Sequence, residues 1–348
     1  MGDAHNVIHF VRDFALQTVL VTGGAGYVGS GLLAVLLAEG YRVIAVDRLS
    51  FGGESLLPVW AHPNFRFERC DICDFASVDR ILEVQRPDAV IHLAAIVGDP
   101  ACKRDPEVAS KVNWEASCHL VQRCAELGIE RLALASTCSN YGKMPDPEAY
   151  VDERSELAPV SLYAELKVRL ERYLLEELPR SEAFSPVALR FATVYGPSPR
   201  MRFDLTVNEF AKEIALGREL AVFGEQFWRP YCHVADFARA FLTVLRAPRH
   251  KIAYQVYNVG DTRENYTKQM IVDEVRKLAP AARISYVKQI DDPRDYRVNC
   301  DRIKRELGFA ITKTVPQGIR EVFELVQLGV VSDPDEQRYY NIPHPRPR

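Results

Sequence analysis

The chain has 348 residues, 47% of them hydrophobic, which is enough for a full core in one large domain or two closely associated ones. Its 44 basic and 47 acidic residues nearly cancel, so the charge favours neither nucleic acid nor an anionic membrane as a partner. No apolar run approaches the roughly 20 residues that cross a bilayer. Residues 1–17 contain two acids and no long apolar stretch, so they predict a short extension and not a signal peptide.

The cysteines indicate free thiols. Cys70 and Cys73 have the spacing of a redox motif or of half a zinc site, but no second pair and no histidine cluster accompany them. We therefore expect unpaired thiols, no metal site and a reducing, cytoplasmic location. The eight cysteines are scattered at positions 70, 73, 102, 118, 124, 138, 232 and 300.

The first predicted unit runs from Thr18 to Asp47 and combines a strand, a glycine turn, a helix and a second strand. Its glycines are Gly23, Gly26 and Gly29. They allow a tight turn, let a diphosphate approach the amino end of the helix, and let the helix pack closely on the strand. Asp47 ends the second strand 18 residues after the last glycine, where a carboxylate accepts hydrogen bonds from an adenosine ribose. The whole pattern predicts a dinucleotide-binding unit.

We expect the dinucleotide to be NAD and not NADP. The Asp47 carboxylate can accept from two ribose hydroxyl groups, whereas it repels a 2′-phosphate. Arg48 follows directly and offers the alternative, because an arginine there can pair with such a phosphate. The acid takes the strand-end position, which favours NAD.

Strands and helices continue to alternate beyond Asp47. This alternation predicts an α/β fold with a doubly wound, parallel sheet of the Rossmann type and right-handed crossovers. Strands are expected at Phe65–Arg69, Ala89–Leu93, Arg131–Ser136 and Pro186–Arg190, and helices at Phe75–Val84, Pro106–Leu127 and Tyr163–Leu178.

Beyond Gly196 and Pro197 the pattern loosens and predicts a smaller C-terminal α/β lobe at the carboxyl edge of the sheet. We place the NAD-binding domain at 18–190, the substrate lobe at 191–332, partly interleaved with the first, and an irregular tail with four prolines at 333–348. In this half strands are expected at Glu219–Phe223, Tyr254–Val259 and Arg283–Tyr286, and helices at Leu205–Leu216, Val234–Leu245, Thr267–Leu278 and Val315–Leu328.

Tyr163, Lys167 and Thr137 are the candidates for chemistry. On a helix, residues four positions apart share a face, so the phenol and the ammonium can both point into one cleft. A phenol with a pKa of about 10 is a weak base, but a nearby ammonium and a positive nicotinamide ring each favour phenolate and lower that pKa. Thr137 ends a central strand at the mouth of the crevice, where its hydroxyl can bind a reacting sugar hydroxyl. The structural alternatives are a surface helix pair and a hydroxyl that only caps backbone.

These features together resemble the extended short-chain dehydrogenase/reductase family, in its nucleotide-sugar epimerase/dehydratase branch, over about residues 18–310. The segments that carry the resemblance are Thr22–Gly29, His92–Ala95, Ser136–Gly142 and Arg190–Pro197, together with Asp47, Asp71, Asn113, Tyr163 and Lys167.

The resemblance implies a set of contacts to NAD. Asp71 and Ile72 would flank the adenine, Ala94 and Ala95 would pass the pyrophosphate, and Asn113 would hold the active-site helix. The implied cofactor-binding residues are Gly23, Gly26, Tyr27, Val28, Gly29, Asp47, Arg48, Asp71, Ile72, Leu93, Ala94, Ala95, Asn113, Tyr163 and Lys167.

The resemblance also implies a nucleoside diphosphate sugar as the substrate. Arg229 begins a segment that resembles the family's arginine-led strand, and a planar guanidinium binds phosphate oxygens bidentately. Thr193 stands where several relatives have asparagine. The implied substrate-binding residues are Thr137, Cys138, Ser139, Thr193, Asn208, Arg229, Arg294 and Arg297.

Cys138 and Ser139 bear on which reaction to expect. In this branch, 4,6-dehydratases carry an Asp-Glu pair directly after the Ser/Thr, and sugar-acid decarboxylases carry a glutamate at the second position. Neither Cys138 nor Ser139 supplies a carboxylic acid, so we expect a 4-epimerase-like reaction through a keto-sugar, with Tyr163 as acid/base. A net nucleotide-sugar dehydrogenase or 4-ketoreductase is the alternative. The intact Thr137, Tyr163 and Lys167 disfavour a regulator that only binds NAD.

Two predicted helices, Pro106–Leu127 and Tyr163–Leu178, carry apolar residues on more than one face. A helix of this kind needs a second partner besides the sheet. Pattern and resemblance together predict a homodimer through a four-helix bundle. The apolar residues concerned are Val112, Leu120, Val121, Leu170, Leu174 and Leu175.

Overall fold

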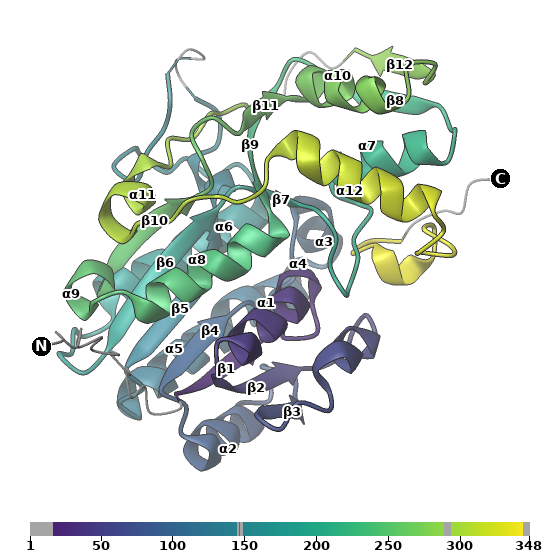
Figure 1. The fold of residues 1–348 in the computed structure, drawn as a ribbon. Coiled ribbons are helices and arrows are strands. Elements are labelled where there is room, and N and C mark those ends of the chain that lie inside the picture. Colours follow the sequence, from purple (N-terminus) through teal and green to yellow (C-terminus); the bar gives the residue numbers. More distant parts are fainter. Residues whose placement is uncertain (1–16, 145, 147–148, 289–293, 344–348) are drawn as a thin grey trace, which may run out of the picture.

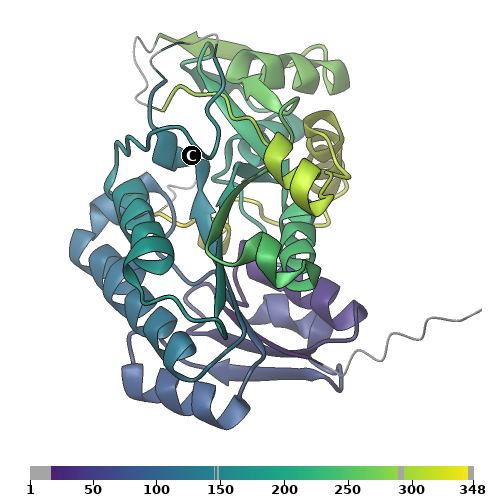
Figure 2. The same ribbon diagram turned by 90° about the vertical axis from the view of Figure 1, so that its left-hand side faces the viewer.

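The computed structural model describes residues 17–144, 146, 149–288 and 294–343. In this part of the chain, helices cover both faces of a central sheet of seven parallel strands (Figures 1 and 2). Residues 1–16 of the predicted extension and 344–348 of the predicted tail lie outside the described residues.

The central sheet has the strand order β10-β6-β5-β4-β1-β2-β3, and every neighbouring pair is parallel. The chain runs outward from β1 in one direction and then returns to β4 on the other side of β1, so the strand order reverses between these two strands. Ligands of such sheets bind at the carboxyl ends of the strands beside this reversal. The predicted doubly wound Rossmann sheet is confirmed. Its strands are β1 (Thr18–Thr22), β2 (Arg42–Asp47), β3 (Phe65–Arg69), β4 (Ala89–His92), β5 (Arg131–Thr137), β6 (Ser185–Phe191) and β10 (Gln255–Val259).

Each face of the sheet builds its own core. Successive side chains of β1 point to opposite faces, so Val19 and Val21 join one core and Leu20 joins the other. Strands buried on both faces are apolar throughout, which is why the sequence shows short apolar runs instead of alternation. The first core is covered by α1 (Tyr27–Ala38) and α8 (Val234–Arg246), and the second by α2 (Phe75–Gln85), α5 (Ser117–Glu126) and α6 (Leu162–Arg172).

The predicted helix Pro106–Leu127 is interrupted by a wider π turn. It consists of α4 (Pro106–Ser110), the π turn η2 (Lys111–Ala116) and α5. The Ser117 hydroxyl donates to the Val112 carbonyl oxygen at 2.9 Å, five residues back, which accommodates the wider turn. The predicted helix Tyr163–Leu178 likewise ends in a π turn, η4 (Tyr173–Glu177).

The C-terminal half forms a second lobe, but it also returns to the first. Residues 255–259, predicted among the strands of the second lobe, form β10 and add an edge strand to the central sheet beside β6. The second lobe proper has a three-stranded sheet of β11 (Asn265–Thr267), β9 (Trp228–His233) and β7 (Thr193–Tyr195), and a parallel pair of β8 (Leu220–Phe223) and β12 (Ile284–Val287). Its main helices are α7 (Thr206–Ala215), α10 (Lys268–Leu278) and α12 (Val315–Gln327), and α9 (Arg249–Ile252) and α11 (Asp301–Leu307) flank β10.

The predicted irregular tail is held against the second lobe. Asp335 is buried and accepts from Lys212 Nζ at 3.0 Å and from Arg218 at 2.6 Å. Tyr340 is buried beside it, and its hydroxyl accepts from Lys212 at 2.8 Å. Short elements complete the chain: η1 (Glu54–Val59), α3 (Asp99–Arg104), η3 (Cys138–Tyr141) and, within the tail, η5 (Gln337–Tyr339).

A buried polar network joins α6 to the carboxyl ends of β5 and β6. Glu171, on α6, accepts from Arg190 NH2 at 2.8 Å, from Asn140 Nδ2 at 2.8 Å and from the Ser136 hydroxyl. Arg190 also donates to the Tyr141 hydroxyl at 3.0 Å. Because both members of the ion pair are buried, either of them alone would be an uncompensated charge in the interior.

Glu171→Ala should therefore lower the free energy of unfolding by about 3–5 kcal/mol, since it leaves the Arg190 guanidinium buried without its carboxylate. Urea denaturation measures the change, and Glu176→Ala, at an exposed position nearby, is the matched control. The double variant Glu171→Met/Arg190→Met should recover part of the loss. A Glu171→Ala protein as stable as the control would contradict the importance of the pair.

Candidate active site

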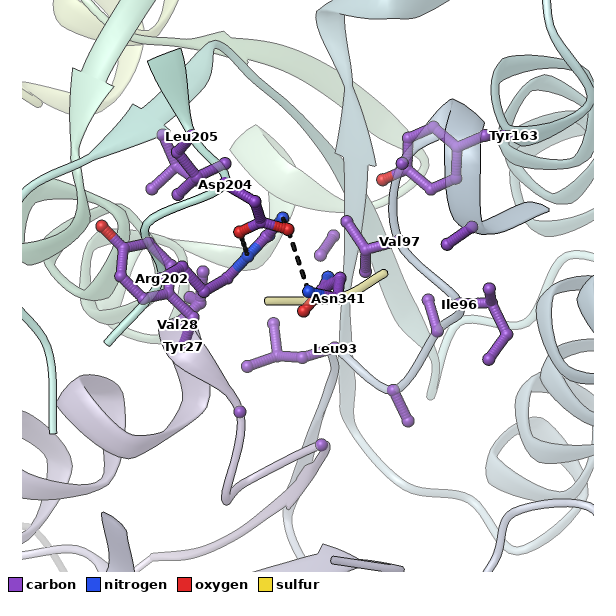
Figure 3. Close-up of a pocket in the computed structure, with 18 of the residues that line it drawn as sticks. Tyr27, Val28, Leu93, Ile96, Val97, Tyr163, Arg202, Asp204, Leu205 and Asn341 are labelled. Carbon is purple, nitrogen blue, oxygen red and sulfur yellow. Dashed lines mark hydrogen bonds and ion pairs between the residues drawn. The ribbon is translucent and has the colours of Figure 1, made fainter. Parts of the chain in front are cut away.

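A cavity of about 1300 Å³ lies at the carboxyl edge of the central sheet and reaches into the second lobe (Figure 3). On one side it is lined by the glycine turn, the loop after β2 and the ends of β4 and β5. On the other side lie the segment after β7, strand β9 and the C-terminal tail. Fourteen of the fifteen residues predicted to bind the cofactor line this cavity, and Asn113 does not.

The glycine turn is shaped for close backbone approach. Gly23 has φ +72°, and a Cβ added there would lie 2.8 Å from the Ala94 nitrogen. A Cβ on Gly29 would overlap the Gly23 carbonyl oxygen. Gly26 caps α1 without a side chain, so the first-turn amides of this helix are left for a ligand. The amino end of α1 thus suits an anion such as a diphosphate.

The Asp47 carboxylate is fixed by two backbone amides. It accepts from Ala25 N at 3.0 Å and from Leu49 N at 2.7 Å, and burial raises its pKa above the ordinary value. The neighbouring Arg48 forms an ion pair with Asp71 at 3.1 Å. The sequence left open whether Arg48 binds a 2′-phosphate. In the structure the Asp71 carboxylate already pairs with it.

A hydrogen-bond chain beneath the cavity fixes the loop after β4. The Thr22 hydroxyl oxygen accepts from Leu93 N and Ala94 N at 3.2 Å each, so its proton goes to His92 Nδ1 at 2.7 Å. His92 Nε2 then donates to the Ser117 hydroxyl at 2.9 Å. Burial lowers the pKa of His92 to about 3, so the imidazole stays neutral and keeps this pattern of donors. In the sequence His92 stood out only as part of a motif, and its role in this chain was not predicted.

Thr137, Tyr163 and Lys167 all line the cavity, where the helix spacing of the last two and the strand-end position of Thr137 placed them. Figure 3 shows the Tyr163 hydroxyl pointing into the cavity from the first turn of α6. Lys167, one turn later, is buried and donates to the Ala135 carbonyl oxygen at 2.8 Å. Thr137 accepts from Ser139 N at 3.1 Å, and its hydroxyl donates to the Ser139 hydroxyl at 3.0 Å.

The pKa of Tyr163 differs from the sequence expectation. Burial raises it above the ordinary value, whereas the charge of Arg202 across the cavity lowers it to a smaller extent. Burial also lowers the pKa of the Lys167 ammonium to about 8. Lys167 donates to backbone, and its ammonium is not among the charges that shift the pKa of Tyr163. A positive nicotinamide ring is the remaining source of the lowering predicted from the sequence.

The residues predicted to bind substrate divide into two groups. Ser139, Thr193, Arg229 and Arg294 line the cavity together with Thr137. The Arg229 guanidinium lies 5.5 Å from the centre of a tyrosine ring, and Arg294 pairs with a carboxylate of α3 at 3.0 Å. These four residues therefore share one cavity with Tyr163.

Cys138, Asn208 and Arg297 are placed outside the cavity lining. The Cys138 thiol donates to a backbone carbonyl of β6 at 3.2 Å, because the turn after Thr137 points it into the core. Asn208 accepts from Gly196 N at 2.8 Å and donates to backbone, so it shapes the loop after β7. The Arg297 guanidinium packs over two aromatic rings at about 5 Å from their centres.

Asn113 also acts on backbone and not on the cavity. Its side chain accepts from Ile96 N at 2.8 Å and donates to Ile96 O at 2.9 Å, from its place in the π turn η2. It therefore orders the loop after β4, whose residues line the cavity.

Several residues of the cavity were missed by sequence reasoning. Arg200, Arg202 and Asp204 follow Gly196-Pro197, and their charges alternate with the buried Met201 and Phe203. This alternation is the only local signal that marks them. The tail residues of the cavity carry no local signal, because their position follows from contacts with α7 that lie more than 100 positions away in the sequence: Gln337, Arg338, Tyr340, Asn341, Ile342 and Pro343.

Fold and site together indicate a dinucleotide-binding enzyme whose cavity is lined by Thr137, Tyr163 and Lys167. A model of the NAD dependent epimerase/dehydratase family matches residues 19–260, and the chain belongs to this family. The predicted family and the predicted cofactor, NAD, are thereby confirmed.

The relatives catalyse more than one reaction. The chain is 29% identical over 268 residues to the UDP-glucuronate 4-epimerase of Thermodesulfobacterium geofontis (strain OPF15), covering 74% of this chain and 80% of the relative. It is 29% identical over 339 residues to the dTDP-glucose 4,6-dehydratase of Shigella flexneri, covering 88% and 91%. Its structure is similar to the crystal structure of the Thermus thermophilus UDP-glucose 4-epimerase in complex with NAD, with a TM-score of 0.79, 28% identity and coverage of 90% and 100%.

The sequence also led to expectations about thiols, metal sites and membrane spans. All eight cysteines are free thiols. No group of three or more His, Cys, Asp or Glu side chains in the described ranges is placed to hold a metal ion. Among the helices of the same ranges, none has the length and apolar character needed to cross a membrane.

NAD should bind more tightly than NADP, because the fixed Asp47 carboxylate repels a 2′-phosphate and Arg48 is already paired. Asp47→Ser should weaken NAD binding about ten- to a hundredfold, which is the loss expected for a hydrogen bond to a charged group. Asp71→Ser frees Arg48 and should improve NADP binding. Titration of each purified variant with both cofactors measures this. Equal affinity of the unaltered protein for NAD and NADP would contradict the assignment.

Proposed function

We propose that the protein is an NAD-dependent epimerase of a nucleoside diphosphate sugar that inverts C4 through a keto-sugar. The observation that carries this proposal is the chemistry of the next side chain after Thr137 that lines the cavity. This side chain is Ser139, because the Cys138 thiol is turned into the core. An elimination of water needs a carboxylic acid at this place, and neither residue supplies one. Relatives with 4-epimerase activity support the choice.

The carboxylates on the other sides of the cavity do not replace the missing acid. Asp99 accepts from Arg294 at 3.0 Å, and Asp204 accepts from Arg202 at 2.9 Å and 3.0 Å. The charge of Arg202 holds the pKa of Asp204 below its ordinary value, so this carboxylate has no proton to give to a leaving hydroxyl group. This pairing favours an outcome in which the sugar keeps all of its oxygens.

The three catalytic side chains divide the work. Bound NAD supplies the hydride acceptor and later the hydride donor. Tyr163 takes the proton of the sugar hydroxyl as the carbon is oxidised and returns it as the keto group is reduced. Thr137 holds that hydroxyl within reach of the phenol. Lys167, anchored on Ala135 O, would hold the cofactor through the ribose next to the nicotinamide.

The diphosphate of the substrate would lie near Arg229. Its guanidinium is oriented by stacking on Tyr296 and lines the cavity on the side of the second lobe. Arg294 lies on the same side. Guanidinium groups match pairs of phosphate oxygens, so a nucleoside diphosphate sugar is the substrate class we propose.

Incubation with a panel of UDP-, dTDP-, GDP- and ADP-sugars, followed by mass spectrometry and chromatography, tests the reaction. We expect a product of unchanged mass that differs only in its retention time, with bound NAD still oxidised at the end. Loss of 18 mass units would indicate a dehydratase. A product two mass units lighter or heavier, with net turnover of the cofactor, would indicate a dehydrogenase or a 4-ketoreductase.

Tyr163→Phe keeps the ring but removes the phenol, and turnover should fall by about 10²–10⁴-fold while NAD stays bound. Thr137→Val should cost less, because the phenol still transfers the proton. Lys167→Met should impair both turnover and NAD binding. Steady-state rates and NAD occupancy measure these effects, with the exposed Tyr286→Phe as the matched control. Near-normal turnover of Tyr163→Phe would show that another group is the base.

We also propose a homodimer in the cytoplasm. The single chain already covers Leu120, Val121, Leu170 and Leu174, so these residues do not require a partner as the sequence suggested. The dimer is instead supported by the resemblance to the extended short-chain dehydrogenase/reductase family. Half-buried side chains of the same helices, such as Trp114, are available for contact with a second copy. Light scattering at micromolar concentration should give twice the mass of the chain, and a monomer would refute the dimer. The eight free thiols suit a reducing compartment.

A further inference from the structure

Arg200 is a buried cation at the edge of the cavity, and no carboxylate of the described residues forms an ion pair with it. Its side chain is 7% exposed, its guanidinium carbon lies 4.0 Å from the centre of the Phe51 ring, and NH2 donates to Asn341 Oδ1 at 2.9 Å. Within the same described ranges, Nε has no hydrogen-bond partner. By contrast, the nearby Arg202 is held by both oxygens of Asp204.

An uncompensated charge in the interior is costly, and the cost is offset when an anion binds. Burial and the charge of Arg202 lower the pKa of Arg200 to about 10, which leaves it charged at neutral pH. The planar guanidinium matches phosphate oxygens in particular. The unpaired cation therefore points to a phosphate-containing ligand in the cavity.

The position of Arg200 identifies which phosphate this is. Phe51, on which it stacks, belongs to the loop that follows Asp47 at the predicted adenosine ribose site. The chain just before it is tied to the first turn of α1, because Ser198 donates to the Tyr27 carbonyl oxygen at 2.6 Å and bonds the Ser30 hydroxyl at 3.1 Å. Arg200 thus lies between the ribose site and the amino end of α1, where a dinucleotide places its diphosphate.

We propose that Arg200 binds the diphosphate of NAD and that the C-terminal segment 335–343 positions it. Asp335 anchors this segment on Lys212, and the Asn341 amide donates to Asp204 at 3.0 Å while its side chain accepts from Arg200. Figure 3 shows the hydrogen bond from Asn341 to Asp204, and Leu93 of the first lobe lines the same cavity. The tail therefore completes the cofactor site, and this inference depends on the cofactor and not on the reaction proposed above.

The test measures the affinities of three ligands for the full-length protein freed of cofactor: NAD, ADP-ribose and UDP. NAD and ADP-ribose share the diphosphate in question, and UDP probes the nucleotide of the substrate. Arg200→Gln should weaken NAD and ADP-ribose alike, about ten- to a hundredfold, and change UDP by less than about twofold. Unchanged NAD affinity would overturn the proposal, and so would a loss confined to UDP. Arg263→Gln, at an exposed arginine, is the matched control.

Asn341→Ala tests the role of the tail separately. It removes the acceptor of Arg200 but keeps the backbone amide that binds Asp204 and the anchor at Asp335. It therefore remains informative if Arg200→Gln fails to fold. NAD should dissociate several-fold faster from Asn341→Ala, with the melting temperature of the cofactor-free protein unchanged. Release of NAD at the unaltered rate would show that the tail does not position Arg200.

Discussion

The buried carboxylate of Glu171 holds α6, the helix of Tyr163 and Lys167, to the sheet. It lies on α6, two turns after Tyr163 and one turn after Lys167, and it binds Ser136 and Arg190 at the ends of two central strands. Lys167 adds a second link through the Ala135 carbonyl oxygen. The position of the phenol relative to Thr137 therefore depends on an ion pair in the interior and not on contacts with ligand.

The electrostatics of the site follow from this burial. Burial disfavours the charged forms of both Tyr163 and Lys167, so the pKa of the phenol is raised and that of the ammonium is lowered to about 8. The protein alone thus keeps the phenol protonated. Binding of a positive nicotinamide ring would favour the phenolate, which in the proposed reaction would couple the proton transfer to the presence of the oxidised cofactor. Arg200 is also buried and forms no ion pair with a carboxylate of the described residues. In the proposed role it would tie the adenosine end of the site to the charge of the same ligand.

Local patterns predicted the parts of the site that are close together in the sequence. The strand Phe65–Arg69 agrees at both ends, and the glycine turn, Asp47, Tyr163 and Lys167 all line the cavity. Features set by distant contacts were not predictable in this way. The place of β10 in the central sheet depends on its pairing with β6, and the place of Asn341 depends on contacts of the tail with α7. The orientation of the Cys138 thiol depends on a tight turn whose geometry the sequence does not reveal.

A deuterium label at C4 of the accepted nucleotide sugar tests the central claim most directly. If hydride leaves for bound NAD and returns to the opposite face within the same closed site, the epimer retains the label fully and NADH does not accumulate. The measurement is mass spectrometry of the product together with absorbance at the wavelength of NADH during turnover. Exchange of the label with solvent, or stoichiometric build-up of NADH, would contradict epimerisation through a transient keto-sugar.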